Sequence, residues 1–241
     1  ESVRLLTLQL ANHETGAIQP VRSFVEFGIP VHTDAAQAVG KIPVNFRELG
    51  VTTLSLSAHK FRGPKGVGAL LVKSGTKLRP LAFGGHQQRG LRPGTEPVGL
   101  AVGMAVALEH AVRTMAETAE RLTRLRRRLL EQLRRKVPPV VVNGPLPGDP
   151  DSLPTTLNLS FPGCRADLLL MALDLAGVAC STGSACSSGS LLPSPVIAAM
   201  GVPDDVLKSA MRFSLGETTT EAEIDEAGTR IAACVRTGRG V

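Results

Sequence analysis

The sequence is poor in aromatic side chains, and this scarcity bears on nucleic-acid binding. Its 241 residues contain no tryptophan, no tyrosine and only 7 phenylalanines. Proteins that bind single-stranded nucleic acids stack the bases on aromatic rings. The most basic stretch, residues 121–136, instead interleaves its arginines with leucines at helical spacing. This pattern predicts an amphipathic helix with most arginines on the solvated face, so we predict no nucleic-acid partner despite the net charge of +6.

Closely spaced cysteines and long apolar runs are also lacking. Cys164, Cys180, Cys186 and Cys234 form no C-x-x-C pair, so we expect neither a metal site nor a disulfide framework, and a reducing, cytoplasmic setting. No apolar run reaches the roughly 18 residues of a spanning helix, which predicts no membrane partner. The first residues show no signal-peptide pattern and resemble a strand entered from upstream. We therefore expect that the chain lacks its natural N-terminus.

Short apolar strands alternate with loops and helices over the first hundred residues, as in the crossover units of a parallel sheet. Strands are expected at residues 3–10, 29–33, 52–57 and 67–72. A long amphipathic helix begins near Val98 and is stopped by Pro138. Beyond it we expect strands at 155–161 and 210–215, a helix at 166–176, and a last helix after the capping box of Thr220 and Glu223. The sequence predicts an α/β fold with a mostly parallel central sheet flanked by helices in residues 1–105, and a smaller α+β domain in residues 106–241.

A lysine follows one of the predicted strands, in the segment TLSLSAHKFRGPKGVG (53–68). Open sheets place their ligands at the carboxyl ends of parallel strands, so Lys60 is positioned to form an imine with an aldehyde cofactor. Along an extended backbone Ser57 and His59 share one face, where both can hydrogen-bond a phosphate or a substrate. The alternative is that Lys60 is a surface lysine at a turn.

A carboxylate follows another strand directly, in the segment VHTDAAQAVG (31–40). Pyridoxal phosphate (PLP) withdraws electrons only while its pyridine nitrogen stays protonated, and Asp34 is suited to hold that proton. Gln37 lies one helical turn further on and would reach the phenolic oxygen of the ring. The alternative is that Asp34 only caps a helix.

A cysteine and an arginine complete the chemically informative residues. Cys186 stands in a run of Gly, Ser and Ala that is expected to form an exposed loop, which suits a thiolate nucleophile, although an incidental loop cysteine is the alternative. Cys180 is instead expected to be a buried strand residue. Arg212 lies in an apolar strand and needs an anionic partner. A substrate carboxylate and a salt bridge within the protein explain it equally well.

Together these segments resemble the cysteine desulfurases, which are PLP-dependent transferases of fold type I in the class V aminotransferase family. The matching pieces follow the family's order over nearly the whole chain and read HTDAAQAVGK, SAHKFRGPKGVG, GGHQQRGLRPGT, GSACSSGS and RFSLGETTTEAEID. The resemblance implies an enzyme that converts L-cysteine to L-alanine and transfers the sulfur to an enzyme cysteine as a persulfide. It also implies a sulfur-acceptor protein, such as an iron–sulfur scaffold.

The resemblance carries roles over to individual positions. Lys60 matches the lysine that holds the cofactor as a Schiff base, and Lys60 or His59 would move the substrate's proton. The other cofactor contacts that it implies are Asp34 with the pyridine nitrogen, Gln37 with the phenolic oxygen, Ser57 and His59 with the phosphate, and Asn12 and His13 beside the ring and the substrate.

Three further positions match residues that act outside this group. Thr95 matches a threonine that reaches the phosphate in the neighbouring subunit, which implies a homodimer with composite sites. Arg212 matches the arginine that binds the substrate carboxylate, and Cys186 matches the cysteine that forms the persulfide.

Two departures from the family pattern concern the cofactor. The chain reads Asn12, His13 and Glu14 where Asn-Asn-Glu is usual. A histidine thus replaces an asparagine that touches the ring oxygen, although a neutral imidazole can still donate one hydrogen bond there. The family's upstream Gly-Thr phosphate turn and stacking histidine do not precede Glu1. We therefore expect this chain to bind PLP poorly or not at all.

Other functions remain open at this point. A selenocysteine lyase or another fold type I aminotransferase would keep the fold, although simple transamination needs no thiol nucleophile. A nucleotide-binding module using residues 63–68 lacks the G-x-x-x-x-G-K-[ST] spacing. An inactive fragment, or a scaffold that only binds a sulfur acceptor, is the third alternative.

Overall fold

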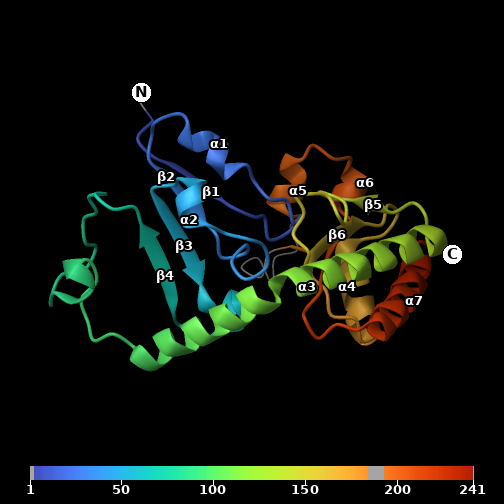
Figure 1. Cartoon of the computed structure of the whole chain (residues 1–241). Helices are drawn as coiled ribbons and strands as arrows, with labels where there is room; N and C mark the ends of the chain where they lie inside the picture. Colours follow the sequence, from blue (N-terminus) through green and yellow to red (C-terminus); the bar gives the residue numbers. More distant parts are fainter. Residues whose placement is uncertain (1–2, 184–192, 241) are drawn as a thin grey trace. The chain divides into compact units, whose positions relative to one another are not determined.

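The computed structural model describes residues 3–183 and 193–240, and these residues form two compact units. The first unit comprises the residues up to Leu10 together with Pro20–Met115, and the second comprises Ala11–Gln19 together with the residues from Ala116 onward. Helix α3, Val98–Lys136, contributes residues to both units (Figure 1). The domain boundary that we place at residue 105 stays a prediction for the intact protein.

The first unit is built on a four-stranded sheet in the order β1-β2-β3-β4. Strands β1 and β2 and strands β2 and β3 pair in parallel, whereas β3 and β4 pair antiparallel. The fold class predicted from the sequence is therefore confirmed. The bounds of the elements are β1 Leu6–Gln9, β2 Val31–Asp34, β3 Thr53–Ser57, β4 Gly68–Val72, α1 Val21–Val25, α2 Phe46–Leu49, η1 Ala58–Phe61 and η2 Gln87–Gly90.

The two faces of this sheet differ in polarity because side chains alternate along each strand. Thr33 and Leu54 are buried on one face, whereas His32 points to the other. There its Nδ1 lies 2.8 Å from Thr53 Oγ1 and its Nε2 lies 3.4 Å from Ser55 Oγ. Because β2 and β3 run in the same direction, their carboxyl ends lie at one end of the sheet, where an open α/β fold places its ligands.

The second unit is an antiparallel three-stranded sheet covered by helices, which confirms the predicted α+β part. Its elements are β5 Val141–Val142, β6 Thr156–Ser160, β7 Ala210–Ser214, α4 Ala166–Leu175, α5 Pro195–Ala199, α6 Asp204–Leu207 and α7 Glu221–Gly238. Helix α7 begins at the predicted capping box, in which the Thr220 hydroxyl accepts from Glu223 N at 3.2 Å and Thr220 N donates to the Glu223 carboxylate at 2.7 Å.

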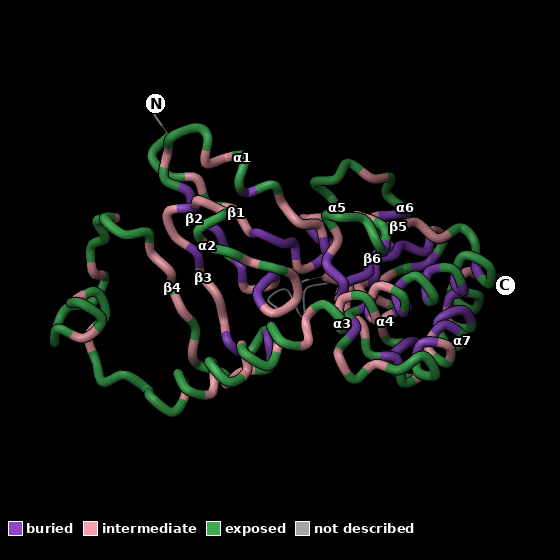
Figure 2. The backbone as a smooth tube through the Cα atoms, viewed as in Figure 1, coloured by how far each residue is buried: buried purple, intermediate pink, exposed green. Residues whose placement is uncertain are grey.

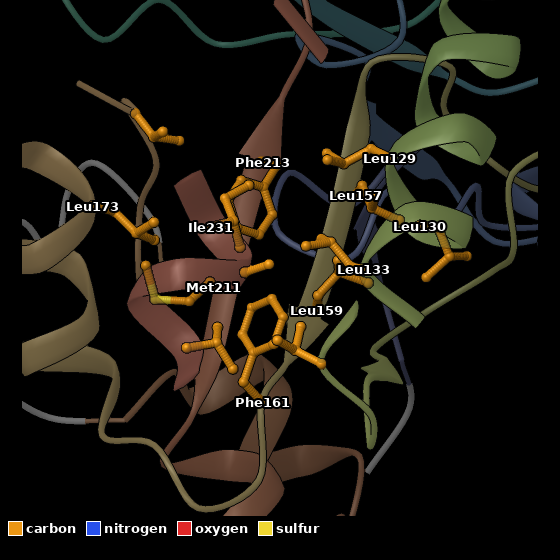
Figure 3. Packing of buried hydrophobic residues seen from close by; sticks show 14 of the residues in the cluster. Leu129, Leu130, Leu133, Leu157, Leu159, Phe161, Leu173, Met211, Phe213 and Ile231 are labelled. Carbon is orange, nitrogen blue, oxygen red and sulfur yellow. The ribbon is translucent and has the colours of Figure 1, made fainter. Parts of the chain in front are cut away.

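One hydrophobic core holds the second unit together (Figure 3). Leu129 and Leu133 of α3 pack on β6 and β7, and Ile231 of α7 lies among the same side chains. Phe161 and Phe213 meet edge to face with their ring centroids 6.4 Å apart, a favoured geometry for aromatic pairs. In Figure 2 buried residues accordingly line the inner side of the second half of α3.

The arginine-rich part of α3 has the predicted amphipathic pattern, with most arginines exposed, and also contains one buried arginine. Its leucines are buried as expected and Arg124, Arg127 and Arg128 are exposed, but Arg126 is only 1% exposed. Its guanidinium donates to the Leu153 carbonyl and to Ser152 Oγ, so it binds the loop before β6. Burial lowers the pKa of Arg126 to about 10, and the charge of Asp149 partly opposes that shift.

The first half of α3 is exposed and apolar. Val98, Val102 and Val106 are 67%, 56% and 60% exposed. Within residues 3–183 and 193–240, α3 is the one helix long and apolar enough to cross a membrane, with a mean hydropathy of 1.3 over 18 residues. Length and composition alone are a weak indication, so the absence of a membrane partner stays a prediction.

Candidate active site

Lys60 lies at the carboxyl end of β3, in the short 3-10 helix η1, and is exposed. Ser57 Oγ and His59 Nδ1 lie 3.0 Å apart, so the two residues predicted to act together are in contact. They meet because the chain turns at Ala58, whose carbonyl accepts from Gly63 N at 2.9 Å. The extended backbone predicted beyond Ser57 is therefore wrong, although the two side chains lie on the same side, as predicted; their binding of a phosphate or a substrate stays a prediction.

Two glycines allow the backbone to approach closely around η1. A Cβ on Gly68 would lie 2.5 Å from the Leu56 carbonyl oxygen across the antiparallel pair. A Cβ on Gly63 would lie 2.9 Å from the Ala58 Cβ. Both distances are too short for real carbon contacts. Gly63 therefore allows the tight turn that presents Lys60, and Gly68 allows the close pairing of β3 and β4 beside it.

Asp34 is exposed and lies at the end of a strand as expected, as the last residue of β2. Its Oδ1 accepts a hydrogen bond from Ala36 N at 2.8 Å, so Asp34 does cap the turn that follows, with one of its two oxygens. The turn is joined to the neighbouring strand, because Ala35 N donates to Ser55 O at 2.9 Å. Asp34 therefore lies beside β3, two residues before Ser57 in the register of the sheet.

Gln37 lies in the same turn and is half-buried. Its Oε1 accepts from Lys41 Nζ at 2.9 Å. The turn also packs on η1, since a Cβ on Gly40 would lie 2.9 Å from the Phe61 Cβ. The first unit thus brings Asp34, Gln37, Ser57, His59 and Lys60 to one end of its sheet.

Thr95 is exposed in the irregular segment between η2 and α3. Its predicted role across a subunit boundary concerns a second chain and stays a prediction.

Asn12 and His13 belong to the second unit. The Asn12 side-chain oxygen accepts from Glu14 N and Thr15 N at 2.9 Å each and from Thr15 Oγ1 at 3.2 Å. Asn12 is only 6% exposed, and its oxygen shapes this turn. Its amide nitrogen is thus the end suited to a ligand.

Arg212 lies on β7 and is held by the same turn. Its Nη1 donates to the His13 carbonyl at 3.2 Å, while its Nε is buried without a partner among the described residues. Burial lowers the pKa of Arg212, and the nearby Glu14 carboxylate opposes this shift. The bond that fixes Arg212 goes to a carbonyl and not to a carboxylate, which leaves donor capacity for an anionic ligand.

Glu14 is a residue that the sequence analysis did not select. It is 2% exposed, its carboxylate accepts from Ser194 Oγ at 2.5 Å, and His13 Nε2 lies 3.5 Å away. Asn158 Nδ2 donates to the Glu14 carbonyl at 3.3 Å. A buried carboxylate must be paired to be tolerated. The sequence feature that could have indicated Glu14 is its position between the polar pair Asn12-His13 and the turn at Thr15-Gly16.

The cysteines differ in their surroundings. Cys186 lies outside the described residues. Cys180 is partly buried but lies in no strand, so the predicted strand is wrong there. Burial, followed by the charges of Asp174 and Cys234, raises the pKa of Cys180 to about 12, which makes it a poor nucleophile. Over residues 3–183 and 193–240, no group of three or more His, Cys, Asp or Glu residues is arranged to hold a metal ion.

A family model described as aminotransferase class-V matches residues 1–227. The chain therefore belongs to the class-V aminotransferase family, whose members use PLP as their general cofactor. Among curated proteins it is similar to a cysteine desulfurase IscS of Dictyoglomus turgidum, with 45% identity over 92% of this chain and 56% of the relative. It is also similar to an IscS-like cysteine desulfurase of Mycobacterium tuberculosis, with 43% identity over 94% of this chain and 58% of the relative.

A solved structure of a NifS-like protein superposes with a TM-score of 0.84 at 38% identity, over 95% of this chain and 60% of that chain. This likeness confirms the type I fold expected from the sequence. The chain spans only a little more than half the length of the curated relatives that it matches.

Proposed function

We propose that this chain forms part of a PLP-dependent cysteine desulfurase, which converts L-cysteine to L-alanine and transfers the sulfur to an enzyme cysteine. The observation that carries the proposal is the grouping of Lys60, Asp34, Gln37 and the Ser57–His59 pair at one end of the first sheet. Relatives at 43–45% identity that are named cysteine desulfurases support the choice of reaction within the family.

The residues at this end of the sheet fit PLP in their chemistry. Asp34 offers a carboxylate to the pyridine nitrogen, and Gln37 offers amide N–H donors to the phenolic oxygen. The bond between Ser57 Oγ and His59 Nδ1 leaves the pair one donor for a phosphate, either the His59 Nε2–H or the Ser57 hydroxyl according to the imidazole tautomer. Lys60 offers the amine that would hold the aldehyde carbon. When bound, the cofactor supplies an electron sink that weakens the Cα–H bond of an amino acid.

Four residues of the chain are proposed to bind the substrate, orient it, or hold or move a proton. Asp34 would keep a proton on the pyridine nitrogen of the cofactor, and the bond that its Oδ1 accepts from Ala36 N fixes the direction of the carboxylate. Lys60 would hold the cofactor and, with its amine free, would be the base that takes the Cα proton of the substrate. His59, whose Nδ1 is held by Ser57, orients the reacting groups beside it. In the second unit, Arg212 binds the substrate carboxylate through the guanidinium nitrogens that do not bind His13.

The sulfur step needs no external oxidant or reductant. The Cβ–S bond of the substrate breaks, an S–S bond forms on Cys186, and Cβ gains a hydrogen, so that cysteine and a thiol become alanine and a persulfide. The assignment of Cys186 rests on the resemblance of GSACSSGS to the family. The raised pKa of Cys180 supports it by making the neighbouring cysteine unsuited to the task.

Reductive trapping of PLP tests the cofactor half of the proposal. We would incubate the 241-residue chain with PLP, reduce it with borohydride and map the modified lysine by mass spectrometry. Because reduction accumulates the adduct, even weak binding gives a readable result. We expect modification at Lys60 that is lost in Lys60→Ala and reduced in Asp34→Asn. Equal modification of exposed lysines such as Lys65 and Lys73 would contradict the cofactor site.

Product analysis tests the reaction. With PLP in large excess, so that weak binding still loads the site, we expect alanine and persulfide from L-cysteine, with both lost in Cys186→Ala while trapping at Lys60 is kept. Cys164→Ala, which changes a buried cysteine, is the matched control and should keep both products. Turnover unchanged in Cys186→Ala would remove Cys186 from the mechanism. Parallel assays with L-selenocysteine decide between a desulfurase and a selenocysteine lyase.

We also propose a cytoplasmic homodimer that delivers sulfur to an acceptor protein such as an iron–sulfur scaffold. The exposed apolar side chains of the first unit support a self-association surface, since Leu81 and Phe83 are 99% and 85% exposed. Analytical ultracentrifugation of the chain and of the double variant Leu81→Ser, Phe83→Ser tests this. A monomer at all concentrations would contradict the dimer.

A further inference from the structure

We propose that Lys41 is a positioning residue of the cofactor site, which fixes the Gln37 amide so that its NH2 group is presented to the phenolic oxygen of the cofactor. The inference deepens the proposed function and rests on it. Lys41 is the last residue of the matching piece HTDAAQAVGK, and the resemblance carries no role over to it.

The observation is a single contact inside one turn. Lys41 Nζ donates to Gln37 Oε1 at 2.9 Å, across four residues, and both side chains are half-buried. The backbone is wound so that the two side chains meet, because Ala38 N and Val39 N donate to Ala35 O at 2.9 and 3.0 Å, and Lys41 N donates to Ala38 O at 3.0 Å. Residues four apart face each other in such a turn.

The chemistry of the two groups forces the orientation of the amide. A lysine ammonium carries only donors, so the atom of Gln37 that faces it must be the oxygen. The NH2 group then points to the other side of the amide plane, as a donor. Without Lys41 the amide can rotate by half a turn at little cost, because the terminal torsion of glutamine is broad and roughly two-fold.

The orientation of the Gln37 amide matters because the phenolic oxygen of the cofactor can accept a hydrogen bond but, when ionised, cannot donate one. An ionised phenolic oxygen has only lone pairs, so a donor stabilises it and an amide oxygen in the same place repels it. The charged donor at Oε1 also polarises the amide and strengthens its N–H groups as donors. Lys41 therefore favours the hydrogen bond from Gln37 to the cofactor oxygen in two ways: it orients the amide, and it strengthens the N–H groups as donors.

The turn holds this arrangement in a fixed place relative to Lys60. Gly40 lies between Gln37 and Lys41 and packs on Phe61, the residue that follows Lys60 in η1. The amide is thus fixed on an element that contacts the element carrying the reactive lysine, as a preorganised site requires.

The orientation can be measured without cofactor. We would record the side-chain amide signals of the 15N-labelled chain by NMR and assign Gln37 by the loss of its pair in Gln37→Ala. We expect a dispersed pair in the wild type, retained in Lys41→Arg because arginine also carries only donors, and collapsed to unstructured positions in Lys41→Met. Lys77→Met, at an exposed lysine of the same unit, is the matched control for lost charge and should change nothing. A Gln37 pair unaffected by Lys41→Met would overturn the inference.

The consequence for the cofactor is measured by trapping. At subsaturating PLP, the yield of reduced adduct at Lys60 should fall about threefold to tenfold in Lys41→Met, the loss expected for one hydrogen bond, and return in Lys41→Arg. The protonated absorbance band of the bound cofactor should also persist to higher pH in Lys41→Met, because the phenolate loses its donor.

The proposed cofactor site and the proposed role of Lys41 are contradicted by different results. A reduced adduct on exposed lysines such as Lys65 and Lys73 without preference for Lys60 would refute the proposed cofactor site, whereas the amide signals would still decide the role of Lys41. An adduct of equal yield and equal pH behaviour in wild type and Lys41→Met would leave the proposed function standing and overturn the inference.

Discussion

Replacing Gly40 by alanine should destabilise the first unit and displace Lys60 at the same time. Gly40 has a φ of +77°, a left-handed conformation that costs an alanine about 1–2 kcal/mol. The added Cβ would lie 2.9 Å from the Phe61 Cβ and 3.1 Å from the Ala111 Cβ. Neither neighbour can swing aside, because a Cβ moves only with its backbone, so overpacking adds about 1–3 kcal/mol. The unfolding free energy should therefore fall by about 2–5 kcal/mol.

Two glycines provide matched controls for this substitution. Gly28 and Gly75 have φ values of +69° and +83°, and a Cβ at either position would meet nothing within 4 Å. Alanine there should cost only the conformational part, about 1–2 kcal/mol. The difference between Gly40→Ala and these two variants isolates the contact with Phe61 and Ala111.

The assay is native-state hydrogen exchange, because a chain with two units is not guaranteed to unfold in one step. The amide of Ala35, which donates to Ser55 O at 2.9 Å, reports on the sheet beside the turn. Its exchange should accelerate about tenfold for each 1.4 kcal/mol lost. Equal acceleration in Gly40→Ala and Gly75→Ala would refute the packing argument, and unchanged trapping of PLP at Lys60 would refute the displacement of η1.

Two further predictions concern the second unit. Because the pKa of Cys180 is raised by burial to about 12, against 9.0 for an ordinary thiol, the unfolded chain loses this proton first. The stability that Cys180 contributes should therefore be intact below about pH 9 and be lost between pH 9 and 12. Urea unfolding at a series of pH values should show this loss, and Cys180→Ala should flatten it; an identical pH dependence in the variant would contradict the shift. Ser194 caps α5 and donates to the buried Glu14 carboxylate, so Ser194→Ala should cost about 2–4 kcal/mol in urea unfolding, from one lost cap and one buried acceptor left unpaired. The cost of Ser194→Ala should shrink by at least 1 kcal/mol in a Glu14→Gln background, since no buried charge is then left unpaired, and additive costs would contradict the pairing.

The strands and the long helix were predictable because each carries a periodic pattern over enough residues. The alternation of Val31 and Thr33 with polar neighbours marks β2, and the leucine spacing of residues 122–133 marks α3. Helices α2, α5 and α6 were missed because four or five residues make too little of a helical period to detect. The burial of Arg126 was not predictable, because helical periodicity describes a face as a whole and does not identify a single arginine that is buried.

The other features that the sequence did not predict depend on hydrogen bonds between residues far apart in the chain. The turn of Asn12, His13 and Glu14 follows β1 closely in sequence but belongs to the second unit. It is bound there by Asn158 and Arg212, which are 144 residues from Glu14 and 199 residues from His13. No local pattern specifies a partner at such a distance, so the buried role of Glu14 could be found only from the folded chain.

The structure also changes how the alternatives for single residues are weighed. From the sequence, Asp34 was either a helix cap or a cofactor ligand, and Arg212 either a structural or a substrate-binding residue. Each side chain has more than one hydrogen-bonding end, and each gives one end to the protein: Asp34 Oδ1 to Ala36 N and Arg212 Nη1 to the His13 carbonyl. The bond at one end fixes the direction of the other, as preorganisation of a site requires. The structural and functional interpretations are therefore two parts of one arrangement, and a side chain held in this way is a stronger candidate for ligand binding than one that makes no bond to its own chain.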